Sequence, residues 1–312
     1  ATLVWSRLKD STFILGVLCS LVSLMGSAYG AGTRQDGGMR SLARIVAGPD
    51  GAPTLVLLHG ITGSAVSLAE AIDHWVGRSY RVVAVDARGH GLSPRWEPTQ
   101  LERAGEVLVE DLIAVLEDLA AASRGRAALG LPTPPAPVVI GHSMGAATAM
   151  VAAGRRPDLV TGVVLEDPAR FGTRGPRELL ARGAARERAR AAEVADLPAA
   201  VGRALETMPD AEALPGVWAS QRTDPGLLLS GVVTPEVPWD EAMAALDVPA
   251  LLLTGDRPGS ARVGREGLET AARNPRISPV LVPGAGHQVR RSDPEAFYRA
   301  VDEWLSELLP VG

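Results

Sequence analysis

The sequence holds little sulfur, few histidines and no excess of basic charge. Cys19 is the only cysteine among 312 residues, which excludes an internal disulfide framework and a cysteine-based zinc site. The five histidines show no metal-binding spacing, so we expect neither a metal nor a cofactor. A formal net charge of −5 argues against a nucleic-acid partner. What is present is a chain with 46% hydrophobic residues, long enough to bury a sizeable core, which favours an enzyme or a small-molecule binder.

The first 38 residues differ in composition from the rest. Ser11–Thr33 carries no charge and is long enough for a secretory signal, cleaved at Ala28–Gly30, or for a membrane anchor. The only lysine, Lys9, lies just before it. This break favours an upstream extension with Met39 as the natural first residue, which predicts a cytoplasmic protein. A true signal or anchor would instead make the protein secreted or membrane-attached, so residues 1–38 stay outside the predicted fold.

From residue 41 onward, short apolar runs alternate with segments of helical periodicity. Continuous apolar runs are typical of strands buried on both faces of a parallel sheet. Helical stripes recur over Leu108–Leu119 and Phe297–Leu308. The alternation predicts an α/β fold with helices on both faces of the sheet. The apolar runs are Thr54–Leu58, Arg81–Val85, Pro137–Ile140, Leu159–Leu165, Pro249–Leu253 and Pro279–Val282.

One long segment, residues 169–245, interrupts this alternation and contains no convincing buried strand. Arg177–Ala192 reads as a charged surface helix, and Pro215–Pro238 as a turn-rich connection. We predict a helical cap inserted into a core made of residues 39–168 and 246–312, because ligands of open α/β sheets bind at the carboxyl edge that such a cap would cover. The alternative is a surface decoration with no role in binding.

The strongest motif is Gly141-His142-Ser143-Met144-Gly145, which follows a predicted strand and precedes the helical run Ala146–Ala153. This is G-x-S-x-G between a strand and a helix, the setting of a nucleophilic serine. The flanking glycines leave room for a sharp turn that strains the serine backbone. Ser143 is therefore the predicted nucleophile.

A serine nucleophile needs a base that a third group orients. Asp256 follows the predicted strand at Pro249–Leu253, and His287 lies in a glycine-rich loop after the last strand. In this motif's order the acid precedes the histidine, so we expect Asp256 and His287 to complete the triad. Glu166 and Asp167, after an earlier strand, are the alternative acids.

Two backbone amides are expected to hold the oxyanion of the reaction. Met144 follows the nucleophile at the start of a helix, and Ile61 follows Gly60 in the loop after the first buried strand. His59 is expected to be a structural loop histidine. His142 is expected to point away from the site.

These motifs together resemble the α/β-hydrolase superfamily, in the family's order and spacing, from about residue 41 to 309. The resemblance implies a mostly parallel eight-stranded sheet, of which Arg40–Val46 could supply an early strand, and a cofactor-free serine triad. The motifs that carry it are His59-Gly60, Asp86 to Ser93, Gly141 to Gly145, Thr254-Gly255-Asp256 and Gly284-Ala285-Gly286-His287.

The first hypothesis for function is a carboxylic-ester hydrolase acting on a small molecule through an acyl-enzyme. Carbon–carbon bond hydrolysis or a haloperoxidase-like perhydrolysis on the same triad is the nearest alternative. A carbon–carbon hydrolase would need a basic residue for a substrate carboxylate, for which the cap offers Arg170, Arg174 and Arg222. The alternative of another class is a non-catalytic ligand-binding member of the fold.

Overall fold

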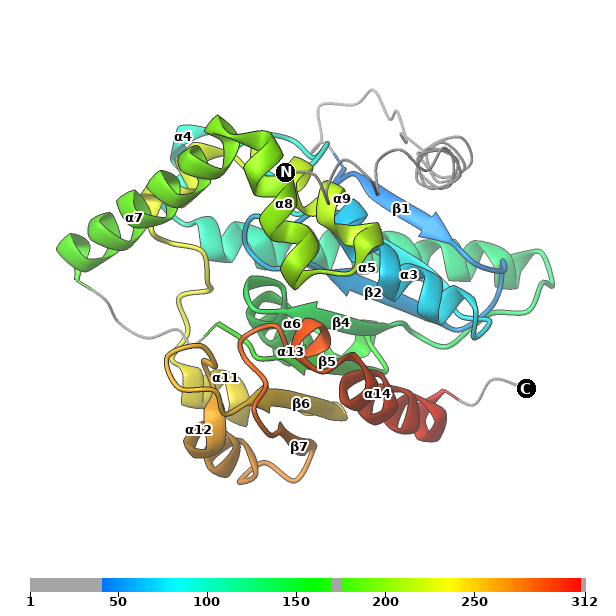
Figure 1. The fold of residues 1–312 in the computed structure, drawn as a ribbon. Coiled ribbons are helices and arrows are strands. Elements are labelled where there is room, and N and C mark those ends of the chain that lie inside the picture. The colour runs from blue at the N-terminus through cyan, green and yellow to red at the C-terminus, as the bar shows by residue number, and fades with distance from the viewer. Residues whose placement is uncertain (1–40, 170–174, 310–312) are drawn as a thin grey trace.

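The computed structural model describes residues 41–169 and 175–309 (Figure 1). Within these ranges seven strands form one sheet in the order β1-β3-β2-β4-β5-β6-β7. The β1–β3 pair is antiparallel, and the other neighbouring pairs are parallel. The strands are β1 (Arg44–Ala47), β2 (Thr54–Leu58), β3 (Arg81–Val85), β4 (Val138–His142), β5 (Gly162–Glu166), β6 (Ala250–Gly255) and β7 (Ile277–Val282).

The sheet confirms the predicted fold class and has one strand fewer, among the described residues, than the eight that the resemblance implied. The predicted runs at Thr54–Leu58 and Arg81–Val85 coincide with β2 and β3. The other runs overlap their strands with ends that differ by at most three residues. The early strand expected within Arg40–Val46 is β1.

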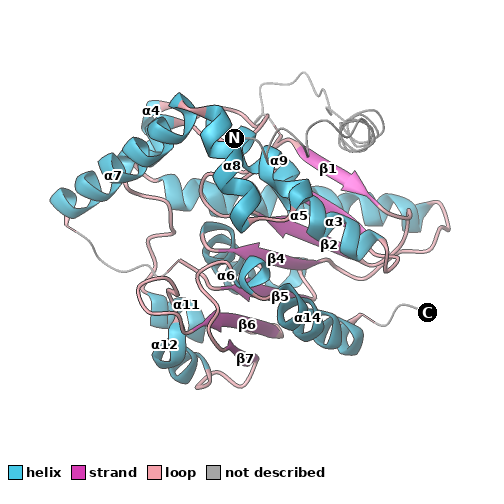
Figure 2. Ribbon diagram, viewed as in Figure 1, coloured by secondary structure: helices cyan, strands magenta, loops and turns pink. Residues whose placement is uncertain are grey.

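Helices cover both faces of the sheet (Figure 2). Alternate residues of β2 divide between two cores: Val56 and Leu58 belong to one, and Leu55 and Leu57 to the other. This alternation follows from the two-residue period of a strand. The first core is covered by α5 (Ala104–Ala128), α6 (Met144–Arg155), α11 (Trp239–Ala244) and α12 (Gly264–Ala271), and the second by α3 (Ala69–Val76) and α14 (Pro294–Leu308).

The segment between β5 and β6 is helical where it is described. Helices α7, α8 and α9 lie together above the sheet in Figure 1, whereas α11 packs into the core beside α6. The predicted charged helix corresponds to α7. The prediction of a turn-rich connection from Pro215 is wrong, because α9 runs through this proline and α10 follows. The helices are α7 (Pro176–Ala195), α8 (Leu197–Thr207), α9 (Asp210–Gln221) and α10 (Pro225–Ser230).

Short helical turns connect the larger elements. They are η1 (Ala65–Leu68), α4 (Pro98–Leu101), η2 (Pro157–Leu159) and α13 (Val289–Ser292).

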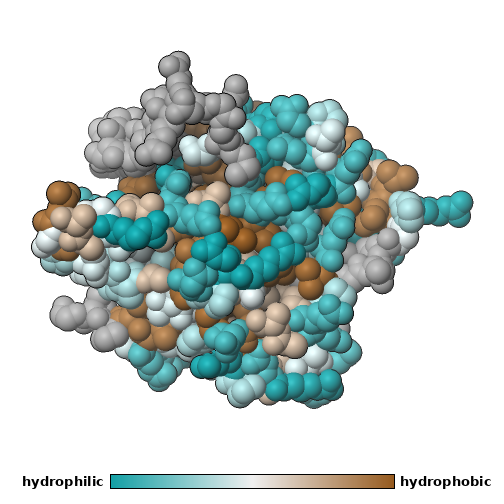
Figure 3. Space-filling view, turned by 180° about the vertical axis from the view of Figure 1, so that it is seen from behind, coloured by the Kyte–Doolittle hydropathy of each residue, from teal (hydrophilic) through white to brown (hydrophobic). Residues whose placement is uncertain are grey.

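The hydrophilic and hydrophobic residues of the surface are interspersed on the face shown in Figure 3. Among the described residues, no helix combines the length and the apolar character that a membrane span requires. The predicted signal or extension at residues 1–38 lies outside the described residues.

Candidate active site

Ser143 stands at the sharp turn between β4 and α6. Its backbone φ of +52° lies in the left-handed region that non-glycine residues rarely adopt. The turn requires glycine at positions 141 and 145, because neither position has space for a side chain. A Cβ on Gly141 would lie 2.6 Å from the Ala146 nitrogen, and one on Gly145 would lie 2.7 Å from the Leu58 Cβ. The sequence therefore holds Ser143 in a strained conformation at the carboxyl edge of the sheet.

The structure brings Ser143 and His287 together, as the sequence predicted. His287 lies in the loop between β7 and α13, and its Nε2 is 2.8 Å from the Ser143 Oγ. The backbone N–H of His287 donates to the Ser260 hydroxyl, which ties this loop to the one after β6. The Ser143 hydroxyl is thus within hydrogen-bond reach of a base.

The third member of the group is Asp167, and the prediction of Asp256 in this place is wrong. The Asp167 Oδ2 lies 2.6 Å from the His287 Nδ1, and the Asp167 side chain is completely buried. Because a carboxylate can only accept, Nδ1 carries the proton and Nε2 is left to accept from Ser143. Asp256 instead accepts from the Gly284 N–H at 2.7 Å and pairs with the exposed Arg265.

The two aspartates differ because of how β5 and β6 end. Asp167 follows β5 with a φ of +36°, which directs its side chain toward His287. The end of β6 and the loop after it then supply its hydrogen-bond donors: the Thr254 hydroxyl at 2.6 Å and the amides of Arg262 and Val263 at 2.9 and 3.0 Å. The segment that was predicted to carry the acid therefore holds the acid that comes from the neighbouring strand.

Glu166, the other alternative acid, is directed away from the triad. Its Oε1 accepts the Arg290 backbone N–H at 2.8 Å, and burial raises the pKa of its carboxyl. In the sheet register Glu166 is paired with His142, each one residue before a triad member. The sequence contained a signal for this arrangement, since Asp167 follows the strand beside the nucleophile strand. That signal did not separate Asp167 from Asp256.

The loop after β2 lies directly against the nucleophile. A Cβ on Gly60 would be 3.3 Å from the Ser143 Cβ. The Gly60 carbonyl is turned away, because it accepts from the His59 Nδ1 at 2.8 Å and from the Gly63 N–H at 3.0 Å. In a trans peptide the next N–H, that of Ile61, points opposite to this carbonyl.

His59 can serve as the Nδ1 donor because its Nε2 accepts the Ala87 N–H at 3.0 Å. The ring is buried, and desolvation lowers its pKa, which keeps it neutral. Met144, the second expected oxyanion donor, is the first residue of α6, where backbone N–H groups have no partner within the helix. Both amides remain predicted oxyanion donors.

His142 does not point away from the site, contrary to expectation. Its Nε2 donates to the His287 carbonyl oxygen at 3.1 Å, and the two rings lie 4.8 Å apart. Burial, together with the nearby His287, lowers the pKa of His142 well below its usual value. A neutral His142 therefore holds the backbone of the loop that carries His287. His142 is still part of β4, and the chain turns only at Ser143. The pairing of His142 with Glu166 in the sheet therefore determines the direction of the His142 side chain.

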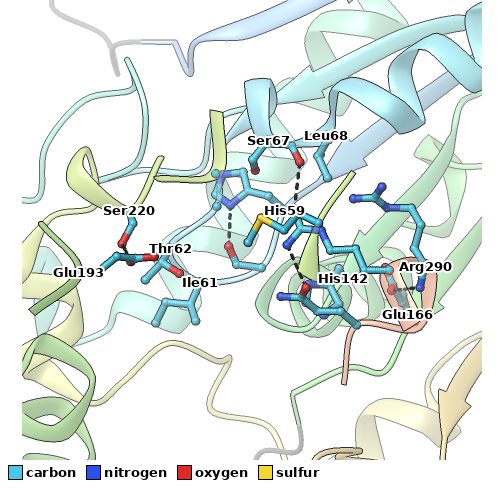
Figure 4. Close-up of a pocket in the computed structure, with 16 residues that line it drawn as sticks. His59, Ile61, Thr62, Ser67, Leu68, His142, Glu166, Glu193, Ser220 and Arg290 are labelled. Carbon is cyan, nitrogen blue, oxygen red and sulfur yellow. Dashed lines mark hydrogen bonds between the residues drawn. The ribbon is translucent and has the colours of Figure 1, made fainter. Parts of the chain in front are cut away.

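Two hollows flank the His287 loop. One is a cavity of about 110 Å³ beneath α9, and Gly60 is among the residues that line it. Ile61 lies on one side of this cavity, and His142 and Arg290 lie on the other (Figure 4). The other is an open groove of about 770 Å³ that is lined by His287 itself. We refer to them as the inner pocket and the outer groove. The inner pocket lies beside Gly60, which is packed against Ser143, and the outer groove lies beside His287.

No group of three or more metal-binding side chains occurs within residues 41–169 and 175–309. The expectation that the protein uses no metal or cofactor stays a prediction. Arg222, named as a possible carboxylate partner, lines neither hollow and donates to the Gly91 carbonyl. Arg170 and Arg174 lie outside the described residues.

Known proteins resemble this chain both in sequence and in fold. A 2-(acetamidomethylene)succinate hydrolase of Mesorhizobium japonicum is 29% identical over 81% of this chain and 88% of its own length. The mouse sn-1-specific diacylglycerol lipase ABHD11 is 38% identical, but the match spans 39% of this chain and 34% of that protein. A thermophilic esterase from Thermogutta terrifontis shares the fold with a TM-score of 0.63 at 23% identity, over 86% of this chain and 94% of that one.

These similar proteins are hydrolases by name. The family model described as the Alpha/beta hydrolase family matches residues 55–300, which run from the second residue of β2 through β7 into the first half of α14. It therefore spans both halves of the sheet and the helical segment between them. The chain belongs to the alpha/beta hydrolase family.

Proposed function

We propose that this protein is a cofactor-free serine hydrolase that cleaves a carboxylic ester of a small molecule. The observation that carries the proposal is the unbroken chain from the Ser143 Oγ through the His287 ring to Asp167, with contacts of 2.8 and 2.6 Å. A hydroxyl, an imidazole and a buried carboxylate in this order form the group that activates a serine for acyl transfer.

In the proposed reaction, Ser143 attacks the ester carbonyl while the His287 Nε2 takes its proton. The amides of Ile61 and Met144 donate to the oxyanion of the tetrahedral intermediate. His287 then gives the proton to the leaving alkoxide, and the acyl group stays on Ser143. Water, deprotonated by His287, releases the acid and restores the serine. Asp167 keeps the proton on Nδ1 and stabilises the imidazolium that forms in each half of the reaction.

Ester cleavage is favoured over hydrolysis of a carbon–carbon bond by what the inner pocket contains. Hydrolysis of a carbon–carbon bond in an acidic substrate would need a free cation near Ser143, and the arginines that line the inner pocket are already paired with glutamates. The names of two similar proteins, a diacylglycerol lipase and an esterase, agree with ester chemistry. A purely ligand-binding protein has no need for the three aligned groups.

Labelling with a fluorophosphonate probe, followed by peptide mass spectrometry, tests the proposal. We expect one adduct, on Ser143, and its loss in His287→Ala, because the serine is unreactive without its base. His74→Ala is the matched control, since His74 lies on α3 and pairs with Asp302 instead. A folded protein that does not label, or that labels equally well without His287, would contradict the serine-hydrolase mechanism.

A further inference from the structure

The position of His287 indicates which part of an ester each hollow receives. The base must reach the oxygen of the leaving alcohol, so this oxygen lies on the side where the imidazole is accessible. His287 lines the outer groove and does not line the inner pocket. The alcohol therefore leaves through the outer groove, and the acyl chain extends into the inner pocket beside Gly60 and Ile61.

The inner pocket is small. Its volume of about 110 Å³ is less than that of a cavity of about 150 Å³ that holds a single benzene molecule. An acyl chain therefore fits only if it has at most about five non-hydrogen atoms beyond the ester carbonyl. Met208 and Gly216 close the pocket on the side of α8 and α9. Long fatty acyl chains are too large for it.

The arginines in the wall of the inner pocket are not free to bind an anion. The Arg290 guanidinium lies 2.8 Å from the Glu70 Oε2 and 2.9 Å from the Glu212 Oε1. Arg291 lies 3.0 Å from the Glu212 Oε2. Glu212 is completely buried, and the side chains of both arginines are at most 12% exposed. The four groups neutralise one another, so a substrate carboxylate would find no available positive charge.

The remaining charged groups of the wall are acidic. Glu193, on α7, accepts from the hydroxyl of the buried Ser220, on α9, and the two side chains lie beside Thr62 at one end of the pocket in Figure 4. No ion pair involves Glu193 within the described part of the chain. At the other end stands the carboxyl of Glu166. Both ends of the pocket thus present hydrogen-bond acceptors.

We propose that the inner pocket selects short, uncharged acyl groups that end in a hydrogen-bond donor, and rejects acyl groups that end in a carboxylate. Glu193 is the specificity-determining residue, because its carboxylate accepts from a donor and repels an anion. This inference rests on the proposed ester hydrolysis. It separates this chain from a hydrolase of an acidic substrate, such as its Mesorhizobium relative is by name.

Three methyl esters of nearly equal shape test the proposal: methyl succinamate, monomethyl succinate and methyl 4-methylpentanoate. They end in an amide, a carboxylate and two methyl groups. We expect kcat/KM for the amide to exceed that for the carboxylate at least about tenfold, because unfavourable juxtaposition of like charges readily costs that much. The hydrocarbon should fall between them.

Substitution of Glu193 then tests its role. Glu193→Gln should narrow the ratio between amide and carboxylate esters by about threefold or more, mainly by improving the carboxylate ester. Glu187→Gln is the matched control. It removes the same charge from α7 six residues earlier, where Glu187 pairs with Arg190 and lines neither hollow, and it should leave the ratio unchanged.

The outcomes separate this inference from the function on which it rests. Hydrolysis of monomethyl succinate at least as efficient as that of methyl succinamate overturns the inference, as does an unchanged ratio in Glu193→Gln. If Ser143 reacts with the fluorophosphonate but none of the three esters turns over, the substrate class is wrong and the hydrolase mechanism stands. If the folded protein neither labels nor hydrolyses any ester, the proposed function itself fails.

Discussion

The ends of β5 and β6 place two aspartates at the same edge of the sheet, but in different surroundings. Asp167, after β5, is completely buried and contacts His287, the Thr254 hydroxyl and two backbone amides. Asp256, after β6, is 25% exposed and pairs with Arg265, itself 67% exposed. One carboxylate has four directional partners inside the protein, and the other serves mainly to bridge two surface loops.

The comparison shows that position at a strand end does not by itself make a carboxylate part of a triad. The same β6 loop contributes in both cases, as the source of Asp256 and as the source of the donors to Asp167. A buried carboxylate is tolerated only where hydrogen bonds replace its lost hydration. The segment from Thr254 to Val263 provides that replacement for Asp167, whereas Asp256 keeps part of its contact with solvent beside Arg265 and the Gly284 N–H.

The sharpest test exchanges each aspartate for asparagine. Asp167→Asn should lower kcat by about 10⁴-fold, because an amide in this place favours the wrong tautomer of His287. Asp256→Asn should change kcat by less than about threefold, since an exposed pair contributes little. Steady-state kinetics with a chromogenic ester gives both values. A larger loss in Asp256→Asn than in Asp167→Asn would reverse the assignment of the acid.

A smaller effect is expected from the residue that links the two regions. Thr254→Val removes the hydroxyl that donates to Asp167, and kcat should fall about tenfold because one hydrogen bond to a charged group is lost. Thr223→Val is the control: among the described residues, the hydroxyl of this buried threonine bonds only to the Ala219 carbonyl, at the C-terminal end of α9. Kinetics combined with urea denaturation separates a loss of activity from a loss of folding. Equal activity in both variants would remove Thr254 from the site.

The smallest effect concerns stability and pH, and it has opposite signs at the two strand ends. Burial raises the pKa of Glu166, so its ionisation costs stability as pH rises through the raised value. The Gly284 N–H and Arg265 lower the pKa of Asp256, so its contribution is present at neutral pH and is lost on acidification.

Relative to the wild type, Glu166→Gln should therefore gain stability as pH rises from about 3.5 to 7, a range that spans the ordinary carboxyl pKa values. Asp256→Asn should lose stability slightly over the same range. Urea midpoints at several pH values measure both trends. Trends of the same sign in the two variants would contradict this picture of the strand ends.

Much of the fold and part of the site could be predicted from the sequence. Continuous apolar runs located β2 and β3 to the residue, because strands buried on both faces have little freedom in composition. Ser143 and His287 were found because steric limits at the turn and the glycine-rich loop leave clear local patterns. The apolar runs, the turn at Ser143 and the glycine-rich loop of His287 are all determined by residues that are close to one another in the sequence.

What could not be predicted depends on contacts between distant segments. The choice between Asp167 and Asp256 is made by donors about 90 residues away from Asp167, which no local pattern reveals. The direction of His142 follows from its register with β5. Pro215 is the sixth residue of α9, beyond the first turn, where a proline removes a helical hydrogen bond; its neighbours Ala213 and Val217 are buried. Tertiary packing there outweighs a local signal for a turn.

Glu212 has a consequence for how substrate enters. This residue of α9 is enclosed by Arg290 and Arg291, which belong to the short helix directly after the His287 loop. Lifting α9 from the sheet would remove Glu212 from both arginines; Arg290 would keep Glu70, and Arg291 would lose the carboxylate it pairs with. Breaking these buried ion pairs is more costly than opening a solvated contact, which disfavours opening of the pocket by a movement of α9. In the proposed ester hydrolysis, the substrate therefore enters and the alcohol leaves by the outer groove, which His287 lines.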